Sequence, residues 1–206
     1  MSRYVDFKVI ILGQEYCGKT SIVERFLNNK VIGENNKYQN TIGAAYGSKK
    51  MCVFGRKIII GVWDTAGSER YEAISKLYYR NARAAILCYD PADAKSYDKL
   101  VFWIHELKKN QPDTLLYFCA TKMDLIKKGE TQRRIEPHKI NELANNHQAK
   151  VYETSAKTGE MIKELFYNIS KEYVCDPRTS LTIFRCRKDS SITLDDINST
   201  TCCNLI

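Results

Sequence analysis

The sequence has 206 residues, of which 44% are hydrophobic and 27% are charged, the balance typical of an ordinary globular protein. This length suits one domain followed by a tail and allows a sizeable core to be buried. The net charge of +8 would suit nucleic acid or an anionic membrane, but no basic run is interleaved with aromatic residues. We therefore expect a solvated basic surface and no nucleic-acid partner.

The cysteines argue against a zinc-bound or disulfide-bonded scaffold. They are scattered, apart from an adjacent pair at Cys202 and Cys203, and none has the C-x-x-C spacing typical of zinc ligands. No secretory leader is recognisable, so we expect a reducing, cytosolic environment. The longest apolar run has the length of a buried strand, and no membrane-spanning helix is predicted.

Short apolar runs predict six strands. They are Phe7–Leu12, Ala45–Phe54, Lys57–Trp63, Ala84–Tyr89, Leu115–Ala120 and Val151–Thr154. The turn-like sequence Phe54-Gly55-Arg56 lies between the second and the third, which we therefore expect to be antiparallel. Runs such as VIIL and AAILCY are apolar at every position, as expected of central strands covered on both faces.

Helical periodicity appears between these strands and after the last of them. Apolar residues recur at helical spacing in two stretches, which contain Tyr97, Leu100, Val101, Ile104 and Leu107, and Met161, Ile162, Leu165, Phe166, Ile169 and Tyr173. The alternation predicts an α/β fold, a doubly wound, mostly parallel, six-stranded sheet with helices on both faces. Ligands bind such a sheet at the carboxyl ends of its strands.

The periodicity ends near residue 175. Beyond Asp176 the sequence becomes rich in Ser, Thr and Asp, and its basic residues are balanced by acidic ones. We therefore predict one domain over residues 1–175 and a flexible, electrically neutral tail over residues 176–206.

A phosphate-binding loop follows the first strand. The spacing Gly13-x-x-x-x-Gly18-Lys19-Thr20 stands between that strand and a helical pattern, the context in which this motif is specific. Backbone N–H groups of the loop can converge on phosphate oxygens, assisted by the positive end of the following helix. Lys19 would neutralise the β- and γ-phosphates, and the Thr20 hydroxyl would bind Mg²⁺. The residues expected at the phosphates are Gly13, Glu15, Tyr16, Cys17, Gly18, Lys19, Thr20 and Ser21.

Two residues inside this loop are large for their position. Glu15 and Tyr16 stand where small residues are common in comparable loops. A carboxylate beside phosphates is repelled unless it faces solvent, so we expect Glu15 to face outward over the mouth of the site. There it would obstruct a catalytic arginine supplied by a partner.

Two strand ends predict that the base is guanine. Thr121-Lys122-Met123-Asp124 follows the fifth strand, and Ser155-Ala156-Lys157 follows the sixth. The Asp124 carboxylate can accept hydrogen bonds from the ring N–H and the amino group of guanine, an arrangement that adenine lacks. The backbone N–H of Ala156 can donate to the guanine carbonyl oxygen, and the stem of Lys122 can lie along the ring. Both segments should share one crevice with the phosphate loop, because all three fall at carboxyl ends of strands.

Taken together, the motifs resemble those of the Rab family within the Ras superfamily of small GTPases. GQEYCGKT, NTIG, WDTAGSE, TKMD and ETSAK occur in the order and spacing of that family, between Asp6 and Val174. IGAAY, GVWDTAG, ERYEAIS, YYRNA and LCYDPAD are similar to segments that distinguish Rab proteins. Ser68 and Thr121, with YQNTIGAA and GSERYEA, are most similar to the Rab-twenty-four subgroup.

The resemblance implies roles for residues in two switch segments. Thr41 is expected to offer its hydroxyl to Mg²⁺ and its N–H to the γ-phosphate, and Asp64 to hold Mg²⁺ through water. The N–H of Gly67 is expected to sense the γ-phosphate, whose loss would release both segments. The implied catalytic residues are Lys19, Thr41, Gly67 and Ser68, the metal ligands are Thr20, Thr41 and Asp64, and the effector surface is Tyr46, Trp63 and Tyr78.

The sequence departs from the family at several positions. Ser68 replaces a glutamine that orients the attacking water, so we expect slow hydrolysis. Thr121 replaces an asparagine that ties the base pocket to the phosphate loop, which predicts weaker nucleotide binding. No aromatic residue lies between Phe26 and Tyr38 to stack on the guanine. Asn81 replaces a glycine, a change that the sequence does not explain.

The last residues match a lipid-attachment signal. Cys202 and Cys203, followed by three residues, resemble a Rab ending that carries two geranylgeranyl groups. The alternatives are a C-a-a-X ending, disfavoured because Asn204 is not aliphatic, and an unmodified apolar end. One lipid chain gives only marginal binding and the tail is neutral, so two chains are the simpler anchor.

Three functions fit these residues. The first is a switch on the cytoplasmic face of endomembranes that hydrolyses GTP slowly and recruits effectors in vesicle traffic. The second is a GTP-binding module that does not hydrolyse GTP and is regulated by exchange, abundance or modification. The third, an ATP-dependent kinase, lacks a second phosphate-acceptor site or lid. By resemblance, the partners are effectors, an exchange factor, a GTPase-activating protein, a GDP-dissociation inhibitor and a prenylation escort, and the chain is expected to be a monomer.

Overall fold

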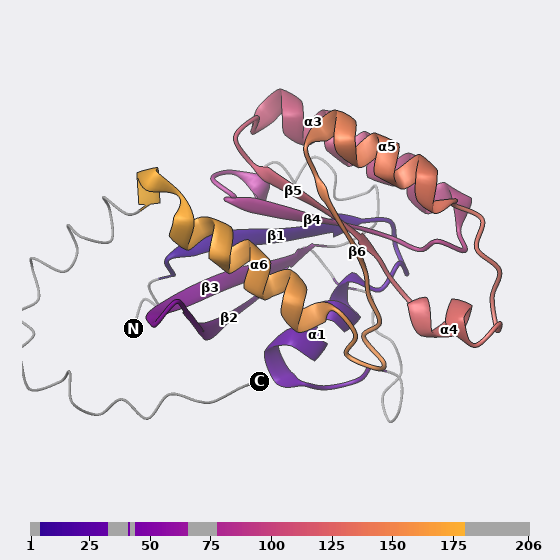
Figure 1. Cartoon of the computed structure of the whole chain (residues 1–206), viewed down its shortest axis with the longest axis horizontal. Coiled ribbons are helices and arrows are strands. Elements are labelled where there is room, and N and C mark those ends of the chain that lie inside the picture. Colours follow the sequence, from indigo (N-terminus) through magenta and orange to yellow (C-terminus); the bar gives the residue numbers. More distant parts are fainter. Residues whose placement is uncertain (1–4, 33–40, 42–43, 66–77, 180–206) are drawn as a thin grey trace, which may run out of the picture.

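The computed structural model of the chain describes residues 5–32, 41, 44–65 and 78–179 (Figure 1). Its elements in chain order are β1 (Phe7–Gly13), α1 (Lys19–Asn28), β2 (Ala44–Val53), β3 (Arg56–Thr65), β4 (Ala84–Tyr89), α3 (Ala94–Asn110), β5 (Leu115–Ala120), α4 (Met123–Lys127), α5 (Pro137–His147), β6 (Lys150–Glu153) and α6 (Ile162–Cys175). β4 and β5 have the predicted bounds, and the other strands differ from the prediction by one or two residues at their ends.

All these strands join one sheet, which confirms the predicted α/β fold. Their order is β2-β3-β1-β4-β5-β6. β2 and β3 are antiparallel, as the predicted hairpin requires, and the remaining neighbours are parallel. The register places Asp64 of β3 beside Ile11 of β1. Asp64 therefore reaches the end of the sheet at which the phosphate loop begins.

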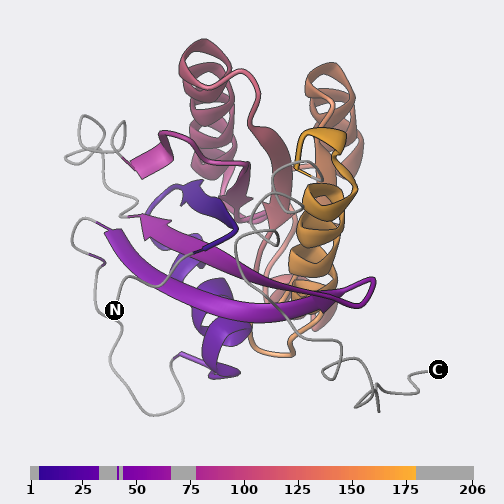
Figure 2. The same cartoon turned by 90° about the vertical axis from the view of Figure 1, so that its left-hand side faces the viewer.

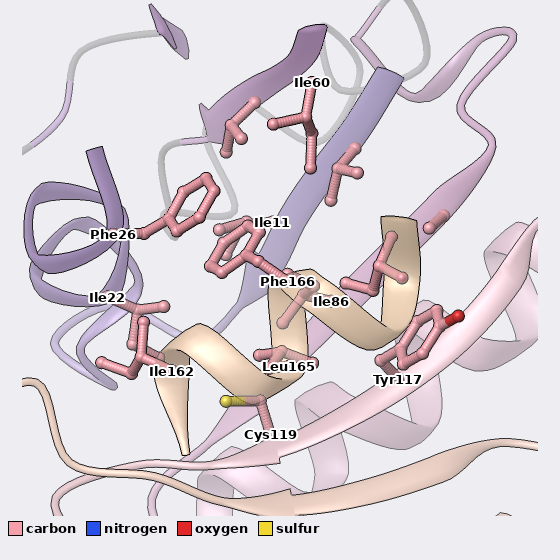
Figure 3. Close-up of a cluster of buried hydrophobic side chains, with 14 of the residues drawn as sticks. Ile11, Ile22, Phe26, Ile60, Ile86, Tyr117, Cys119, Ile162, Leu165 and Phe166 are labelled. Carbon is pink, nitrogen blue, oxygen red and sulfur yellow. The ribbon is translucent and has the colours of Figure 1, made fainter. Parts of the chain in front are cut away.

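Helices cover the two faces of the sheet over separate cores. Val9 and Ile11 of β1 belong to the core beneath α1 and α6, whereas Ile10 and Leu12 belong to the core beneath α3 and α5. Figure 3 shows the first core, in which Phe26 of α1 stacks on Phe166 of α6 with ring centroids 3.6 Å apart. This alternation explains why β1 reads as a continuous apolar run.

The apolar pattern does not predict α4 and α5. α4 has only five residues, and α5 buries only Ile140 and Ala144, so neither carries a long apolar stripe. Local signals account for where helices begin. α5 starts at Pro137, a position that favours proline. α3 starts after Asp93, whose side chain accepts a hydrogen bond from the N–H of Lys95.

Candidate functional site

The phosphate loop begins where β1 passes close to β4. Gly13 has a φ of 147°, and a Cβ at this position would collide with the carbonyl oxygen of Cys88. Only glycine can therefore turn the chain here without moving a backbone. Tyr16 and Gly18 also adopt positive φ, at 60° and 93°, which curls the loop before α1 begins.

Lys19 lies at the centre of this loop. Its side chain is only 5% exposed, and its ammonium donates to the carbonyl oxygens of Gly13 at 3.0 Å and Gln14 at 2.7 Å. The lysine thus folds back across the loop from the first residue of α1. A fixed cation and the N-terminus of a helix coincide there, an arrangement that attracts phosphate.

Three oxygen-bearing side chains meet beside the loop. The hydroxyls of Thr20 and Thr41 are 3.0 Å apart, although 21 residues separate them in the chain. Asp64 is 1% exposed, and neither of its carboxylate oxygens has a hydrogen-bond partner within the described residues. Burial raises the pKa of this carboxyl, and the nearby Thr20 hydroxyl and Lys19 ammonium partly oppose the rise.

This group of oxygens fits Mg²⁺. A buried carboxylate without a partner is costly unless a cation or ordered water satisfies it, and Mg²⁺ prefers carboxylate, hydroxyl and water ligands. Elsewhere in the described segments, no three His, Cys, Asp or Glu side chains are grouped to hold a metal ion. The residues that would hold Mg²⁺ are therefore the predicted set of Thr20, Thr41 and Asp64.

A pocket adjoins the phosphate loop, and the residues predicted to recognise the base line it. It encloses about 280 Å³. The Ser155 hydroxyl donates to Oδ1 of Asp124 at 2.6 Å and accepts from the N–H of Thr158 at 3.2 Å, so the carboxylate is held in one orientation. The N–H of Met123 donates to the carbonyl oxygen of Thr154, which joins the two segments. The pocket is lined by Gly18, Ser21, Ile22, Val31, Ile32, Thr121, Lys122, Asp124, Leu125, Ala156 and Lys157.

Thr121 connects this pocket to the phosphate loop. Its hydroxyl donates to the carbonyl oxygen of Cys17 at 2.6 Å and lies 3.2 Å from that of Tyr89. The threonine is fully buried, and its N–H also donates to Tyr89. The Thr121 hydroxyl thus contacts the phosphate loop although the side chain has no amide, and the weaker nucleotide binding expected from the sequence stays a prediction. Its neighbour Lys122 has a φ of 56° and pairs with Asp90 at 2.8 Å.

Val31 and Ile32 are members of the pocket that the sequence analysis missed. They follow the end of α1, where Asn29 takes a φ of 54°, and both line the cavity beside Asp124. The available signal was an apolar pair inside the polar stretch NNKVIGENNK. Aliphatic side chains therefore line this part of the pocket, in a segment where the sequence has no aromatic residue.

The large residues of the loop face a different cavity. Glu15 and Tyr16 line a space of about 480 Å³ whose opposite wall is the first half of α3, including Lys95 and Lys99. Glu15 is half-buried and Tyr16 is exposed. Next to Glu15 and Tyr16 along the loop, the Cys17 thiol is buried, which raises its pKa.

Two of the three predicted effector aromatics are in contact. Tyr46 and Trp63 face each other across β2 and β3, with ring centroids 4.7 Å apart and Tyr46 exposed. The Lys8 ammonium lies 4.8 Å from the Trp63 ring. Tyr78, the third, is half-buried before β4. The predicted residues Gly67, Ser68, Cys202 and Cys203 lie outside the described residues.

Comparisons with known proteins show the family to which the chain is similar. A profile of the Ras family matches residues 8–175. Ras-related protein Rab-24 from Dictyostelium discoideum is 38% identical over 169 residues, which are 82% of this chain and 81% of that protein. Ras-related protein Rab-21 from Mus musculus is 36% identical over 84% of this chain and 75% of its own length. Rab-5A from Dictyostelium discoideum is 32% identical over 86% of both chains.

The described part of the chain has no helix with the length and apolar character needed to cross a membrane.

The profile extends from β1 to α6, and the relatives named above are all Rab proteins, as the motifs predicted. The chain belongs to the Ras family and, within it, to the Rab small GTPases.

Proposed function

We propose that the protein is a GTP-operated switch in vesicle traffic that hydrolyses GTP slowly by itself. One observation carries the proposal. Asp124, oriented by Ser155, lines a pocket, and Thr121 connects this pocket to the phosphate loop around Lys19. A base and its phosphates can therefore be held together. The Asp124 carboxylate would accept from guanine and the Ala156 N–H would donate to it, which excludes adenine.

Hydrolysis would convert GTP and water to GDP and phosphate by in-line attack on the γ-phosphorus. Lys19 would stabilise the charge on the phosphate oxygens, and Gly67 would donate its N–H to the γ-phosphate. Thr20, Thr41 and Asp64 would hold Mg²⁺, which neutralises phosphate charge when bound. Ser68 is too short to position the attacking water as glutamine does, and losing that positioning costs on the order of 10²-fold in rate.

Partners would complete and read the switch. A GTPase-activating protein can supply an arginine and a glutamine, and Glu15 would obstruct that arginine at the mouth of the site. Effectors would read Tyr46, Trp63 and Tyr78 when GTP holds the switch segments. An exchange factor would reload GTP, and a GDP-dissociation inhibitor would extract the GDP form from the membrane.

Membrane attachment would come from the tail. We propose residues 1–175 as the switch domain and residues 176–206 as a tether whose Cys202 and Cys203 carry geranylgeranyl groups, attached with the help of a prenylation escort. Two lipid chains hold a protein at a membrane where one is marginal. The protein would then act at the cytoplasmic face of endomembranes. Changing both cysteines to serine should leave a tagged chain diffuse in the cytosol.

Single-turnover release of γ-phosphate from bound GTP tests the enzymatic part. We expect slow release from the natural chain and release on the order of 10²-fold faster from Ser68→Gln. The nucleotide that co-purifies with the natural chain, identified by chromatography, should include GTP. No release over hours from either form, with or without candidate activators, would replace this proposal with a binding module that does not hydrolyse GTP.

A further inference from the structure

The tip of the β2–β3 hairpin carries an aromatic side chain in an unfavourable place. Phe54 is 61% exposed and has a φ of 50°. A bulky residue at positive φ is strained, and an exposed phenyl ring gains nothing from the hydrophobic effect. Asparagine or glycine would suit this turn better. The stability of the fold therefore does not account for a phenylalanine here.

Basic residues and a second aromatic ring surround Phe54. The Lys171 ammonium of α6 lies 5.8 Å from the Phe54 ring centre. Tyr167, one turn earlier on the same ridge of α6, is 40% exposed. Arg56 and Lys57 follow the turn at the start of β3. We call Phe54, Arg56, Lys57, Tyr167 and Lys171 the hairpin patch.

Within the described residues, no carboxylate forms an ion pair with the basic side chains of the hairpin patch, Arg56, Lys57 and Lys171. Three carboxylates at this end of the molecule are engaged elsewhere: Asp6 accepts from the N–H of Ile59, Glu172 pairs with Lys150, and Asp176 pairs with Arg83 and Arg178. Glu164, the other acid of α6, lies two turns nearer the nucleotide end.

The hairpin patch lies at the end of the molecule from which the tail leaves. In Figure 1 the hairpin turn and the carboxyl end of α6 both lie on the left, the helix end above the turn, and the phosphate loop after β1 lies on the right; Figure 2 views the molecule from that left side. Contact between Ser170 of α6 and Met51 of β2, 3.4 Å apart, places the two elements side by side. The chain continues past Asp176 from here toward the cysteines proposed to carry lipid.

We propose that the hairpin patch rests on an anionic membrane surface. Phe54 would enter the boundary between headgroups and acyl chains, and the basic side chains would lie over anionic headgroups. A protruding side chain can insert among lipid headgroups without a preformed site. An acidic protein partner would need a groove that receives the hairpin tip. The inference rests on the proposed lipid anchor, to which it adds a second contact, and it gives the tethered domain one preferred orientation.

The orientation places the switch away from the bilayer. Tyr46 lies near the start of β2 and Phe54 directly follows its last residue, eight positions later, or about 25 Å of strand. When Phe54 touches the membrane, the Tyr46–Trp63 pair and the nucleotide face the opposite direction. A partner from the cytosol can then reach the switch without displacing the domain from the surface.

The test is vesicle flotation of the full chain without lipid. The vesicles contain phosphatidylcholine alone or with about one-third phosphatidylserine. We expect at least about tenfold stronger binding to the anionic vesicles, lost in high salt. Phe54→Asn with Lys171→Gln should lower this binding at least about fivefold. Asparagine suits the positive φ, so the variant should fold.

A matched control removes the same kind of pair elsewhere. In α3, Lys99 lies over the ring of Phe102 at 4.5 Å, and Phe102 is exposed. Phe102→Gln with Lys99→Gln should change vesicle binding less than about twofold if the hairpin patch is the contact. Equal losses in both variants, or no preference for anionic vesicles, would overturn the inference. GDP affinity is measured in parallel and tests the proposed switch separately. The hairpin patch lies at the other end of the molecule, so its variants should leave GDP affinity unchanged.

Discussion

The Thr121 hydroxyl links the phosphate loop to the predicted base-reading segment. One hydroxyl reaches the carbonyl oxygen of Cys17 in the phosphate loop, while the backbone of Thr121 continues into the base-reading segment. The link is buried from solvent. The segments predicted to bind base and phosphates are thereby joined.

Thr121→Val keeps the shape of the side chain and removes this hydrogen bond. The Cys17 carbonyl oxygen then loses a buried donor, a loss that costs about 1–3 kcal/mol. We expect GDP to dissociate about tenfold faster, measured by displacement of a fluorescent analogue. Thr121→Ser, which retains the hydroxyl, should remain within about threefold of the natural rate. An unchanged rate in the valine variant would show that the link does not hold the nucleotide.

At the scale of single residues, motifs that are defined by residue type and spacing can be predicted from the sequence. Gly13, Lys19 and Asp124 are recognisable because their roles require one residue type at one position. Val31 and Ile32 were not recognised, since any apolar pair can line a pocket and only the fold brings this pair beside Asp124. Asn81 is explained by its φ of 58°, which asparagine tolerates better than most residues.

Among the elements, the turns at strand and helix ends carry the strictest requirements. Gly13→Ala would force a Cβ into the carbonyl oxygen of Cys88, between two central strands that cannot separate. We expect a loss of about 3 kcal/mol in the free energy of unfolding, measured with urea. Gly129→Asn is the matched control: its φ is 71° and no atom lies within 4 Å of the added Cβ. This change should cost less than about 0.5 kcal/mol.

The carboxyl end of α6 predicts a pH effect. Hydrogen bonds from the Arg178 side chain and N–H, with Arg83 nearby, lower the pKa of Asp176 to about 2 from 3.8. A lowered folded-state pKa stabilises the fold above the unfolded value, and the contribution is lost as the pH falls through the folded value. The melting temperature of the natural chain should therefore exceed that of Asp176→Asn at pH 5. The difference should shrink as the pH falls from about 4 toward 2. A difference that stays constant over this range would assign the effect to packing.

How far elements can be predicted depends on what specifies them. β4 and β5 have the predicted bounds because buried central strands are apolar on both faces and end where polarity returns. α4 and α5 have no such signature. The five residues that make up α4 are held by the strand ends around Asp124. α5 exposes most of its surface. Tertiary contacts, which the sequence pattern does not contain, decide those two helices.

On the scale of the whole molecule, the nucleotide site joins the ends of β1, β3, β5 and β6. A ligand bound there would contact all of these segments at once, so GDP with Mg²⁺ should stabilise the entire domain. At about 1,000 times the dissociation constant, the gain is about 4 kcal/mol. Differential scanning fluorimetry should show a rise in melting temperature with GDP that chelation of Mg²⁺ reduces. ADP at the same concentration should leave the melting temperature unchanged, and an equal rise with ADP would contradict the assignment of Asp124.

The position of β2 at the margin of the sheet has a consequence for how copies of the protein behave together. In the part of the chain that is described, no strand pairs with the outer side of β2. An open strand edge invites pairing with another copy, the first step of aggregation. Lys50 is exposed in the middle of this strand, whereas the Lys49 ammonium is held by the Phe26 carbonyl oxygen of α1. A charged lysine on an edge strand opposes such pairing, so we expect Lys50 to help keep copies of the protein separate at high local concentration.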